Sequence, residues 1–391
     1  MNIILFDNQY REHLLPFTFL RPLCEIRVGI CTIREKWERA LKTKSSFFTQ
    51  GYLSELFPIE ITDDNLFIAG NLLPDTKVVN AIKTLEVGEV LKDSRNSVLA
   101  LRAGSFEEFT ALENFKSIIY VFEYKSINSK QDIFSFNNEQ LIDDFNNLTK
   151  RRKSDALRNT NMFIGNPMNL FIEAGAVING AIINCETGPV FIGKNVQIME
   201  GSCIRGPVAI LEGSVVKMGT KIYGATTIGP CCKVGGEISN VVMFGFSNKA
   251  HDGYLGNAVI GEWCNIGAGT NASNLKNNYG EVAQWNYASQ SYENTGLQFC
   301  GLMMGDHSKC SIGSMFNTGT VVGVCCNLFG ADFHRTFIPS FSMGNRNKGY
   351  SLYPLEKVLE SEQAMLLRRG CEMHKTFDKI LLYILTEIKQ K

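Results

Sequence analysis

The sequence has no excess of either charge and no long apolar run. Its 391 residues carry 39 Lys and Arg against 39 Asp and Glu, so the net charge at pH 7 is zero. Without a basic surface the chain has little with which to hold nucleic acid or an anionic membrane, and we expect neither as a partner. No stretch reaches the roughly eighteen apolar residues of a membrane span. The first residues, Met1–Asp7, lack the basic and long apolar regions of a signal peptide, and we expect them to form a buried strand.

Cysteine is present, but not in the patterns that bind zinc or build a disulfide framework. The 12 cysteines are scattered along the chain, and two pairs are adjacent in sequence, Cys231–Cys232 and Cys325–Cys326. No CxxC pair with zinc spacing occurs. We therefore expect reduced, mostly buried thiols in a cytoplasmic protein.

Glycine is scarce in the first 160 residues, which hold five of the 35 glycines. This part alternates apolar segments with helical patterns. The expected strands are Ile3–Phe6, Leu66–Ala69, Val98–Leu101 and Ile118–Phe122, and the expected helices are Arg34–Leu41 and Asn138–Leu148. Such alternation predicts a wound α/β domain, which we place at residues 1–155.

The middle of the chain has a strict six-residue period. Eight β-branched residues follow one another at this spacing without a miss: Ile192, Ile198, Ile204, Ile210, Val216, Ile222, Ile228 and Val234. A helix cannot produce this spacing, because six is not a multiple of 3.6. Short flat strands joined by tight turns can, with each aliphatic side chain inside a prism. The pattern predicts a left-handed parallel β-helix of hexapeptide repeats, which we place at residues 156–345.

The period breaks twice, between Val234 and Ile260 and between Ile266 and Met304. Each gap is a multiple of six plus two, which predicts that both segments hold insertions leaving the coil as loops. After the coil, apolar residues from Phe377 onward return to helical spacing. We expect one or two amphipathic helices in a third segment, residues 346–391.

One stretch narrows the family. Ser247-Asn-Lys-Ala-His-Asp-Gly-Tyr-Leu-Gly256 is followed by Ile260-Gly-Glu-Trp-Cys-Asn-Ile-Gly-Ala-Gly-Thr270. It resembles the acetyltransferase domain of the bifunctional N-acetylglucosamine-1-phosphate uridyltransferase/glucosamine-1-phosphate acetyltransferase family, which has Lys-Ala-Gly-His, Tyr-Leu-Gly and Asn-Ile-Gly-Ala-Gly-Thr. The resemblance covers roughly residues 190–350 and implies a homotrimer that uses acetyl-CoA.

The resemblance makes His251 the catalytic base, and the chemistry agrees. An ammonium must lose a proton before its nitrogen can attack a thioester, and a histidine titrating near neutrality suits that task. The resemblance further implies a set of sugar-binding residues: Tyr254, Asn265, Asn274 and Lys249. For acetyl-CoA it implies Ser314, beside the pantetheine arm, and Arg346, at the phosphates.

The amino-terminal domain departs from the usual sugar nucleotidyltransferase pattern. The Gly-x-Gly-Thr-Arg loop is missing after Phe6, but Arg21-Pro-Leu resembles the usual Lys-Pro-Leu segment. Arg21 and Arg27 are therefore predicted to hold the phosphates of UTP. The metal-binding aspartate is replaced by Asn71, so a Mg²⁺ ion would have to use Asp7 or Asp75.

These observations predict a transferase that acetylates glucosamine-1-phosphate and couples the product to UTP, giving UDP-N-acetylglucosamine. Two alternatives stay open. The chain could acetylate another amino sugar and carry a degenerate nucleotidyltransferase domain, or it could be a non-catalytic scaffold that binds sugar nucleotides.

Overall fold

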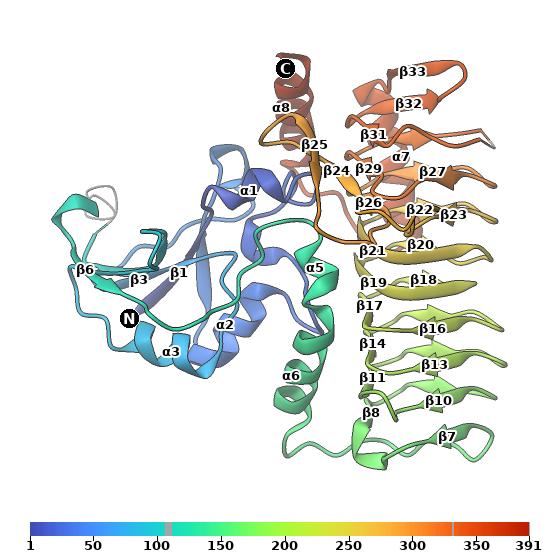
Figure 1. Ribbon diagram of the computed structural model, residues 1–391, viewed down its shortest axis with the longest axis horizontal. Helices are drawn as coiled ribbons and strands as arrows, with labels where there is room; N and C mark the ends of the chain where they lie inside the picture. The colour runs from blue at the N-terminus through green and yellow to red at the C-terminus, as the bar shows by residue number, and fades with distance from the viewer. Residues whose placement is uncertain (106–111, 331, 391) are drawn as a thin grey trace. The chain divides into compact units, whose positions relative to one another are not determined.

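The computed structural model describes residues 1–105, 112–330 and 332–390 (Figure 1). The chain divides into two compact units. The first unit contains Met1–Leu14, Leu20–Ile26 and Cys31–Ser129, and the second contains Leu15–Phe19, Arg27–Ile30 and Lys130–Lys391. Within the described residues, no helix is both long and apolar enough to cross a bilayer. All twelve cysteines are free thiols, as expected from their scatter.

The first unit is built on a six-stranded mixed sheet. In spatial order its strands are β2 (Ser45–Phe48), β1 (Asn2–Phe6), β3 (Asn65–Ala69), β5 (Val98–Ala103), β4 (Glu89–Lys92) and β6 (Lys116–Ile119). Strand β1 runs parallel to both of its neighbours, whereas β5 is antiparallel to β3 and β4. The four predicted strands are all present, although the last begins and ends earlier than predicted. Strand β3 is buried along its whole length, which accounts for its unbroken apolar sequence.

Short helices flank this sheet: α1 (Tyr10–His13), η1 (Leu23–Glu25), α2 (Ile33–Leu41), η2 (Gly51–Leu53), α3 (Thr76–Lys83) and η3 (Leu112–Asn114). Helix α2 starts with a capping box, in which the Thr32 hydroxyl and the Glu35 carboxylate each accept from the other residue's backbone N–H. Trp37 on α2 is fully buried and donates to the carbonyl oxygen of Leu72, 2.7 Å away. These local signals explain why the predicted helix forms.

The second unit contains a left-handed parallel β-helix, as predicted, with three flat faces. Face 1 contains β7 (Met162–Ile164), β10 (Ile182–Asn184), β13 (Cys203–Arg205), β16 (Lys221–Tyr223), β23 (Asn271–Ala272) and β28 (Met315–Phe316). Face 2 contains β8 (Leu170–Ile172), β11 (Val190–Ile192), β14 (Val208–Ile210), β17 (Thr226–Ile228), β26 (Met303–Met304), β29 (Val321–Val322) and β31 (Phe337–Ile338). Two longer strands, β19 (Glu237–Gly245) and β21 (Tyr254–Glu262), cross from face 1 to face 2. A single 3-10 turn, η4 (Pro167–Asn169), precedes β8.

Face 3 carries the residues that matter most for the site. It contains β9 (Val177–Ile178), β12 (Gln197–Ile198), β15 (Val215–Val216), β18 (Lys233–Val234), β20 (Asn248–Lys249), β22 (Asn265–Ile266), β27 (Lys309–Cys310), β30 (Asn327–Leu328), β32 (Ser342–Asn345) and the antiparallel β33 (Gly349–Leu352). Because the strands pair in register, equivalent side chains stack about 4.8 Å apart along the face. The inward column on face 3 includes Val216, Val234, Lys249 and Ile266, all at most 3% exposed.

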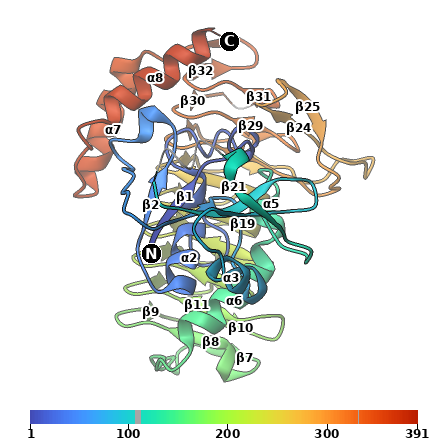
Figure 2. The ribbon, with the colours of Figure 1, turned by 90° about the vertical axis from the view of Figure 1, so that its left-hand side faces the viewer.

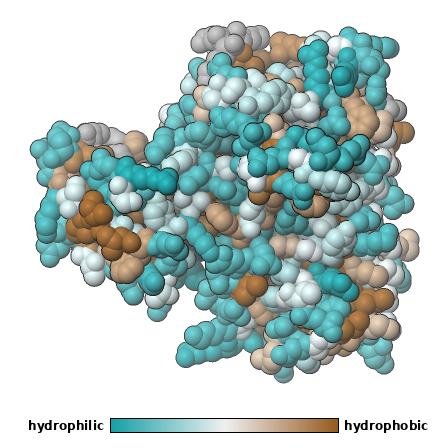
Figure 3. Space-filling model, viewed as in Figure 1, coloured by the Kyte–Doolittle hydropathy of each residue, from teal (hydrophilic) through white to brown (hydrophobic). Residues whose placement is uncertain are grey.

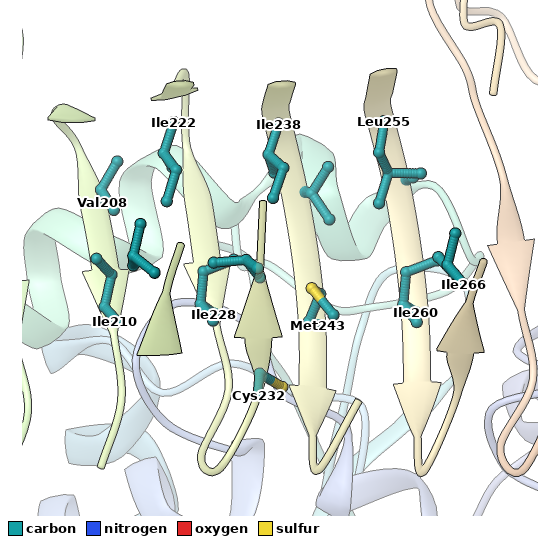
Figure 4. Close-up of a cluster of buried hydrophobic side chains, with 14 of the residues drawn as sticks. Val208, Ile210, Ile222, Ile228, Cys232, Ile238, Met243, Leu255, Ile260 and Ile266 are labelled. Carbon is teal, nitrogen blue, oxygen red and sulfur yellow. The ribbon is translucent and has the colours of Figure 1, made fainter. Parts of the chain in front are cut away.

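The interior of the β-helix is a column of aliphatic side chains. Figure 4 shows Ile222, Ile238 and Leu255 on face 1 pointing toward Ile228, Met243 and Ile260 on face 2. A regular turn uses 18 residues, as in the pairing of Val216 with Val234. The hexapeptide period therefore corresponds to one side of the coil, and three such sides make one regular turn.

The prediction of a loop at the first break in the period is wrong. Between Val234 and Ile260 the chain stays in the coil, and the inward residues are Ile238, Met243, Lys249 and Leu255. Three of the five steps are shortened to four or five residues. Two of them lie where β19 and β21 pass round a corner without an intervening turn, and the third spans the short Gly235-Gly236 turn before β19. The spacing from Val234 to Ile260 therefore departs from a multiple of six because sides of the coil are shortened, and not because a loop is inserted.

At the second break the predicted insertion is present. Between Ala272 and Met303 the chain leaves the coil and forms a hairpin of β24 (Ala283–Asn286) and β25 (Ser291–Asn294). Trp285 on this hairpin stacks on Phe337 of face 2, with ring centroids 4.3 Å apart. The aromatic contact fastens the excursion to the coil.

Face 2 is covered by other segments of the same unit. Helices α5 (Asp132–Ser135) and α6 (Asn137–Thr149) pack beside β17, β19 and β21, as Figures 1 and 2 both show. Asn137 links them to the coil, because its side chain donates to Ala225 O at 2.6 Å and accepts from the N–H of Gly29 at 2.7 Å. Gly29 has φ +77°, and a Cβ there would lie 2.6 Å from Asp144. This covering explains why strands on face 2 are buried on both sides.

Where one or two helices were predicted, the structure has two, α7 (Leu355–Arg368) and α8 (Phe377–Gln390). Helix α7 buries Val358, Glu362 and Leu366, which are four residues apart and share one face. Glu362 forms ion pairs with His307 and Lys309 of the coil. The outer surface in the view of Figure 3 is mostly hydrophilic, in keeping with an apolar column that is enclosed by the coil.

Candidate active site

His251 lies at the corner where face 3 passes into face 1, between β20 and β21. Its side chain is exposed and makes no hydrogen bond within the described residues. Gly235 shapes this corner from the turn below, because a Cβ there would meet the carbonyl oxygen of Ala250 at 2.5 Å. The close stacking of the two turns holds the His251 backbone while its imidazole faces solvent.

Lys249 occupies an interior position of the β-helix, two residues before His251. Its side chain is 2% exposed, and its Nζ donates to the carbonyl oxygens of Gly235 at 3.0 Å and His251 at 2.8 Å. Burial lowers the pKa of this ammonium to about 8, although Asp252 opposes the shift. These contacts favour a role in fixing the corner over the direct sugar contact that the resemblance implied.

A groove lies between face 3 and α7, and we call it the cationic groove. Its volume is ≈ 720 Å³. Its coil wall is made by the outward residues Lys233, Asn248, Asn265 and Lys309, and His251 lies at its edge. The other wall is made by α7 and the residue after it, with Ala364, Met365, Arg368 and Arg369. Two of the predicted residues, His251 and Asn265, are therefore brought together here.

The other predicted sugar-binding residues lie beyond the corner, on the face 1 side. The side-chain amide of Asn274 donates to the Tyr254 hydroxyl at 3.0 Å and to the side-chain oxygen of Asn257 at 2.7 Å. Burial raises the pKa of the Tyr254 phenol, so its hydroxyl is a neutral donor at neutral pH. Asn257 was missed in the sequence, since nothing near it repeats a known pattern. The three side chains form a polar cluster that can hydrogen-bond sugar hydroxyls.

The two residues predicted for acetyl-CoA are placed differently from each other. Ser314 is fully buried in a turn, and its hydroxyl donates to the carbonyl oxygen of Ser311 at 2.9 Å. Arg346 is exposed at the tip of the β32–β33 hairpin. Neither is among the residues that line the cationic groove.

The first unit has a cavity of its own, ≈ 530 Å³, at the carboxyl end of β1. Its lining includes Asp7, Asn8 and Gln9 from the segment after β1, Phe48 from β2, and Arg95. Arg95 is a cation that the sequence reasoning missed, because it follows no recognisable motif. Arg21 and Arg27 do not line this cavity. Arg21 is buried in the first unit near Glu25, whereas Arg27 belongs to the second unit and donates to the Ile30 carbonyl.

The predicted metal ligands do not fit a Mg²⁺ site in this arrangement. Asp7 Oδ2 accepts from Arg11 Nε at 2.9 Å and from the Thr49 hydroxyl at 2.6 Å, and its Oδ1 accepts from the N–H of Leu23 at 2.7 Å. Asp75 caps α3 by accepting from two backbone N–H groups. Within residues 1–105, 112–330 and 332–390, no three His, Cys, Asp or Glu side chains converge. A carboxylate that is already saturated with donors is a poor ligand for a hard cation.

Comparison with known proteins finds relatives of parts of the chain. Residues 3–153 match the family model described as sugar nucleotidyl transferase. The bifunctional protein GlmU of Synechococcus elongatus is 32% identical over 99 residues, 23% of this chain and 22% of the relative. GlmU of Rippkaea orientalis is 38% identical over 85 residues, 21% of this chain and 18% of the relative. The chain thus spans about a fifth of the length of the curated relatives it matches.

Two solved structures also resemble the chain at low identity. The polySia-specific acetyltransferase NeuO is 12% identical, with a TM-score of 0.26, over 50% of this chain and 86% of that one. The Francisella novicida UDP-N-acetylglucosamine acyltransferase is 13% identical, with a TM-score of 0.22, over 60% of this chain and 85% of that one. These scores are too low for a comparison of site geometry.

The chain joins a segment that matches the sugar nucleotidyl transferase family model to a parallel β-helix of hexapeptide repeats. The chain resembles the bifunctional GlmU family, as the sequence around His251 predicted.

Proposed function

We propose that the β-helix transfers an acetyl group from acetyl-CoA to the amine of glucosamine-1-phosphate, with His251 as the base. The observation that carries this proposal is the position of His251. Its imidazole is exposed at the edge of a large groove, and its backbone is held by an interior lysine. A base with a fixed backbone and an accessible ring suits proton removal from a bound amine.

The chemistry assigns a task to each side of the corner. The polar cluster of Tyr254, Asn257 and Asn274 binds the sugar hydroxyls, and Asn265 contacts the same ligand from the groove. His251 takes a proton as the amine nitrogen bonds to the acetyl carbon. The carbon–sulfur bond then breaks, and the thiolate of coenzyme A leaves and is protonated. Binding both substrates at one corner supplies the proximity that this step needs.

For the first unit we propose transfer of a uridylyl group from UTP to the acetylated sugar phosphate, giving UDP-N-acetylglucosamine. The family match of residues 3–153 supports this proposal. The predicted phosphate ligands Arg21 and Arg27 do not line the cavity at β1, so we propose Arg95, which does, as the phosphate ligand there. We further propose that the protein works in the cytoplasm as a homotrimer.

One observation favours a second candidate, an acetyltransferase whose first unit does not transfer nucleotides. Asp7 is held by three hydrogen bonds, and Asn71 is bonded to Asn8 and Asn128 through its side chain. Both positions at the end of β1 and β3 are thus occupied by internal contacts.

The test follows two products separately. The full chain is incubated with acetyl-CoA and glucosamine-1-phosphate, with and without UTP and Mg²⁺, while free thiol and pyrophosphate are measured. We expect thiol release without UTP, and pyrophosphate release when UTP and Mg²⁺ are added. Thiol release alone would support the second candidate.

A matched pair of variants identifies the base. His251→Asn is expected to lower the rate of thiol release on the order of 10²–10⁴-fold, the usual contribution of a general base. His374→Asn, which changes an exposed histidine in the linker between α7 and α8, is expected to leave the rate unchanged. Equal rates for both variants would reject His251 as the base.

A further inference from the structure

Three cations gather at one end of the cationic groove without a carboxylate partner. Lys233 projects outward from β18, Arg368 ends α7 and Arg369 follows it. None of the three forms an ion pair with an Asp or Glu among the residues that the structure describes. Cations on protein surfaces usually spread apart or pair with acids, so this grouping calls for an anion.

Arg369 is held in place. Its guanidinium donates to the carbonyl oxygen of Cys231 and to the side-chain oxygen of Asn248, each at 2.9 Å. A guanidinium has five N–H donors, so two bonds to the coil leave others for a ligand. The coil therefore orients this residue before any ligand arrives, which lowers the entropy cost of binding.

The environment of Lys233 shows how closely the charges lie. Burial together with Arg369, Lys217 and Arg368 lowers the pKa of the Lys233 ammonium. Repulsion among like charges is a cost that a bound anion would remove.

The C-terminal end of α7 repels an anion less than a helix end with unpaired carbonyl oxygens would. The last carbonyls of a helix carry partial negative charge. Here the carbonyl oxygens of Leu366 and Leu367 accept from the N–H groups of Arg369, Gly370 and Cys371. With these oxygens satisfied, the two arginines dominate the electrostatics of this wall.

We propose that Lys233, Arg368 and Arg369 form a phosphate-binding site at the end of the cationic groove. Arginine and lysine side chains suit phosphate oxygens, and His251 lines the same groove. The phosphate belongs to the donor coenzyme or to the acceptor sugar phosphate. The choice between these two ligands rests on the proposed function, whereas the phosphate site does not.

Helix α7 carries two of the three cations, so its attachment builds the site. Glu362 lies between the His307 ring and the Lys309 ammonium and fixes the helix against face 3. From Glu362 to Arg369 the helix makes two turns, which brings the arginines to the level of Lys233 and Asn248. The site therefore depends on the C-terminal helix and not on the coil alone.

Calorimetric titration of the full chain tests the proposal directly. Coenzyme A, dephospho-coenzyme A, glucosamine-1-phosphate and uncharged N-acetylglucosamine are titrated into the wild-type protein and into Lys233→Gln and Arg368→Gln. Loss of one charge-assisted contact is expected to weaken the bound phosphate ligand roughly tenfold. Lys194→Gln and Arg205→Gln change exposed cations elsewhere on the coil and should bind as the wild type does.

The ligand is identified by which of the two compounds loses affinity in the variants. Weaker binding of coenzyme A assigns the site to the donor, and weaker binding of glucosamine-1-phosphate assigns it to the acceptor. Either result supports a phosphate site, even if no acetyl transfer is detected. Unchanged affinity of both ligands in both variants overturns the proposal, and so does the absence of any binding to the wild-type protein.

Discussion

The ammonium nitrogen of Lys249 lies 2.8 Å from the backbone carbonyl oxygen of His251. A charged group inside an aliphatic column is costly unless its hydrogen bonds are satisfied. Here the second acceptor is the carbonyl oxygen of Gly235, in the turn below. The lysine thus joins two neighbouring turns at the corner that presents the proposed base.

Replacing this lysine should impair catalysis more than it impairs binding. In Lys249→Met the interior stays filled, but the carbonyls of Gly235 and His251 lose their donor and the corner can shift. A displacement of about 1 Å at a catalytic group can reduce the rate on the order of 10²-fold. We expect kcat for acetyl transfer to fall while KM for acetyl-CoA changes little. Ile198→Met, at a buried inward position of the same face outside the groove, is the control and should retain the wild-type kcat.

The same residue should make stability depend on pH. The pKa of Lys249 is lowered to about 8, against about 10.4 in an unfolded chain. Between these values the unfolded state binds more protons, so the free energy of unfolding rises with pH. Urea denaturation across this range should show the rise in the wild-type protein and a smaller one in Lys249→Met. Parallel pH profiles for the two proteins would contradict the assignment.

The attachment of α7 should depend on Glu362. Burial opposes ionisation, yet His307 and Lys309 lower the pKa of this carboxyl, so it is charged at neutral pH. Glu362→Gln leaves Lys309 and His307 without their anion, and loss of one partner of a buried pair costs up to about 3–5 kcal/mol. Thermal denaturation should show a clear loss of stability, and the α7 arginines should lose their fixed position.

A second glutamate on the same helix provides the comparison for that experiment. Glu360 pairs with Lys357 at 2.9 Å, but both side chains are more than 60% exposed. Surface pairs of this kind contribute roughly 0–1 kcal/mol, so Glu360→Gln should melt almost as the wild type does. Equal melting temperatures for the Glu360 and Glu362 variants would show that α7 is not held by the buried pair.

The Tyr254 hydroxyl should contribute to acceptor binding. Tyr254→Phe keeps the ring and removes the group that accepts from Asn274. A hydrogen bond between neutral groups contributes about 0.5–1.5 kcal/mol, so KM for the amino sugar should rise about twofold to tenfold. Steady-state kinetics with the sugar varied at saturating acetyl-CoA measure this effect. Tyr292→Phe, on the β24–β25 hairpin, should leave KM for the sugar unchanged.

The β-helix could be predicted from sequence because its period is set by covalent geometry. Six residues make one side, and every sixth side chain must be apolar to fill the interior. The prediction failed between Val234 and Ile260 because shortened sides and an inserted loop give the same remainder. Lys249 hid the continuity further, since a lysine at an inward position does not look like part of the repeat.

The site was predicted where it is local and missed where it is assembled from distant segments. His251 and Asn265 are encoded in one short stretch, and the coil brings them to the same groove. Arg368 and Arg369 lie more than a hundred residues further along, and only the packing of Glu362 against face 3 brings them there. No pattern near these arginines could have predicted that contact.

The excursion after Ala272 has a consequence for how the β-helix folds. Most paired strands on face 3 are 18 residues or fewer apart, but Ile266 pairs with Cys310, 44 residues later. Closing the longer loop costs about 0.8 kcal/mol more in chain entropy, by the logarithmic dependence on loop length. During folding, growth of the coil from either end should slow at the turn where Ile266 pairs with Cys310. The two halves of the β-helix are then expected to form as separate kinetic units that join when the hairpin docks on Phe337.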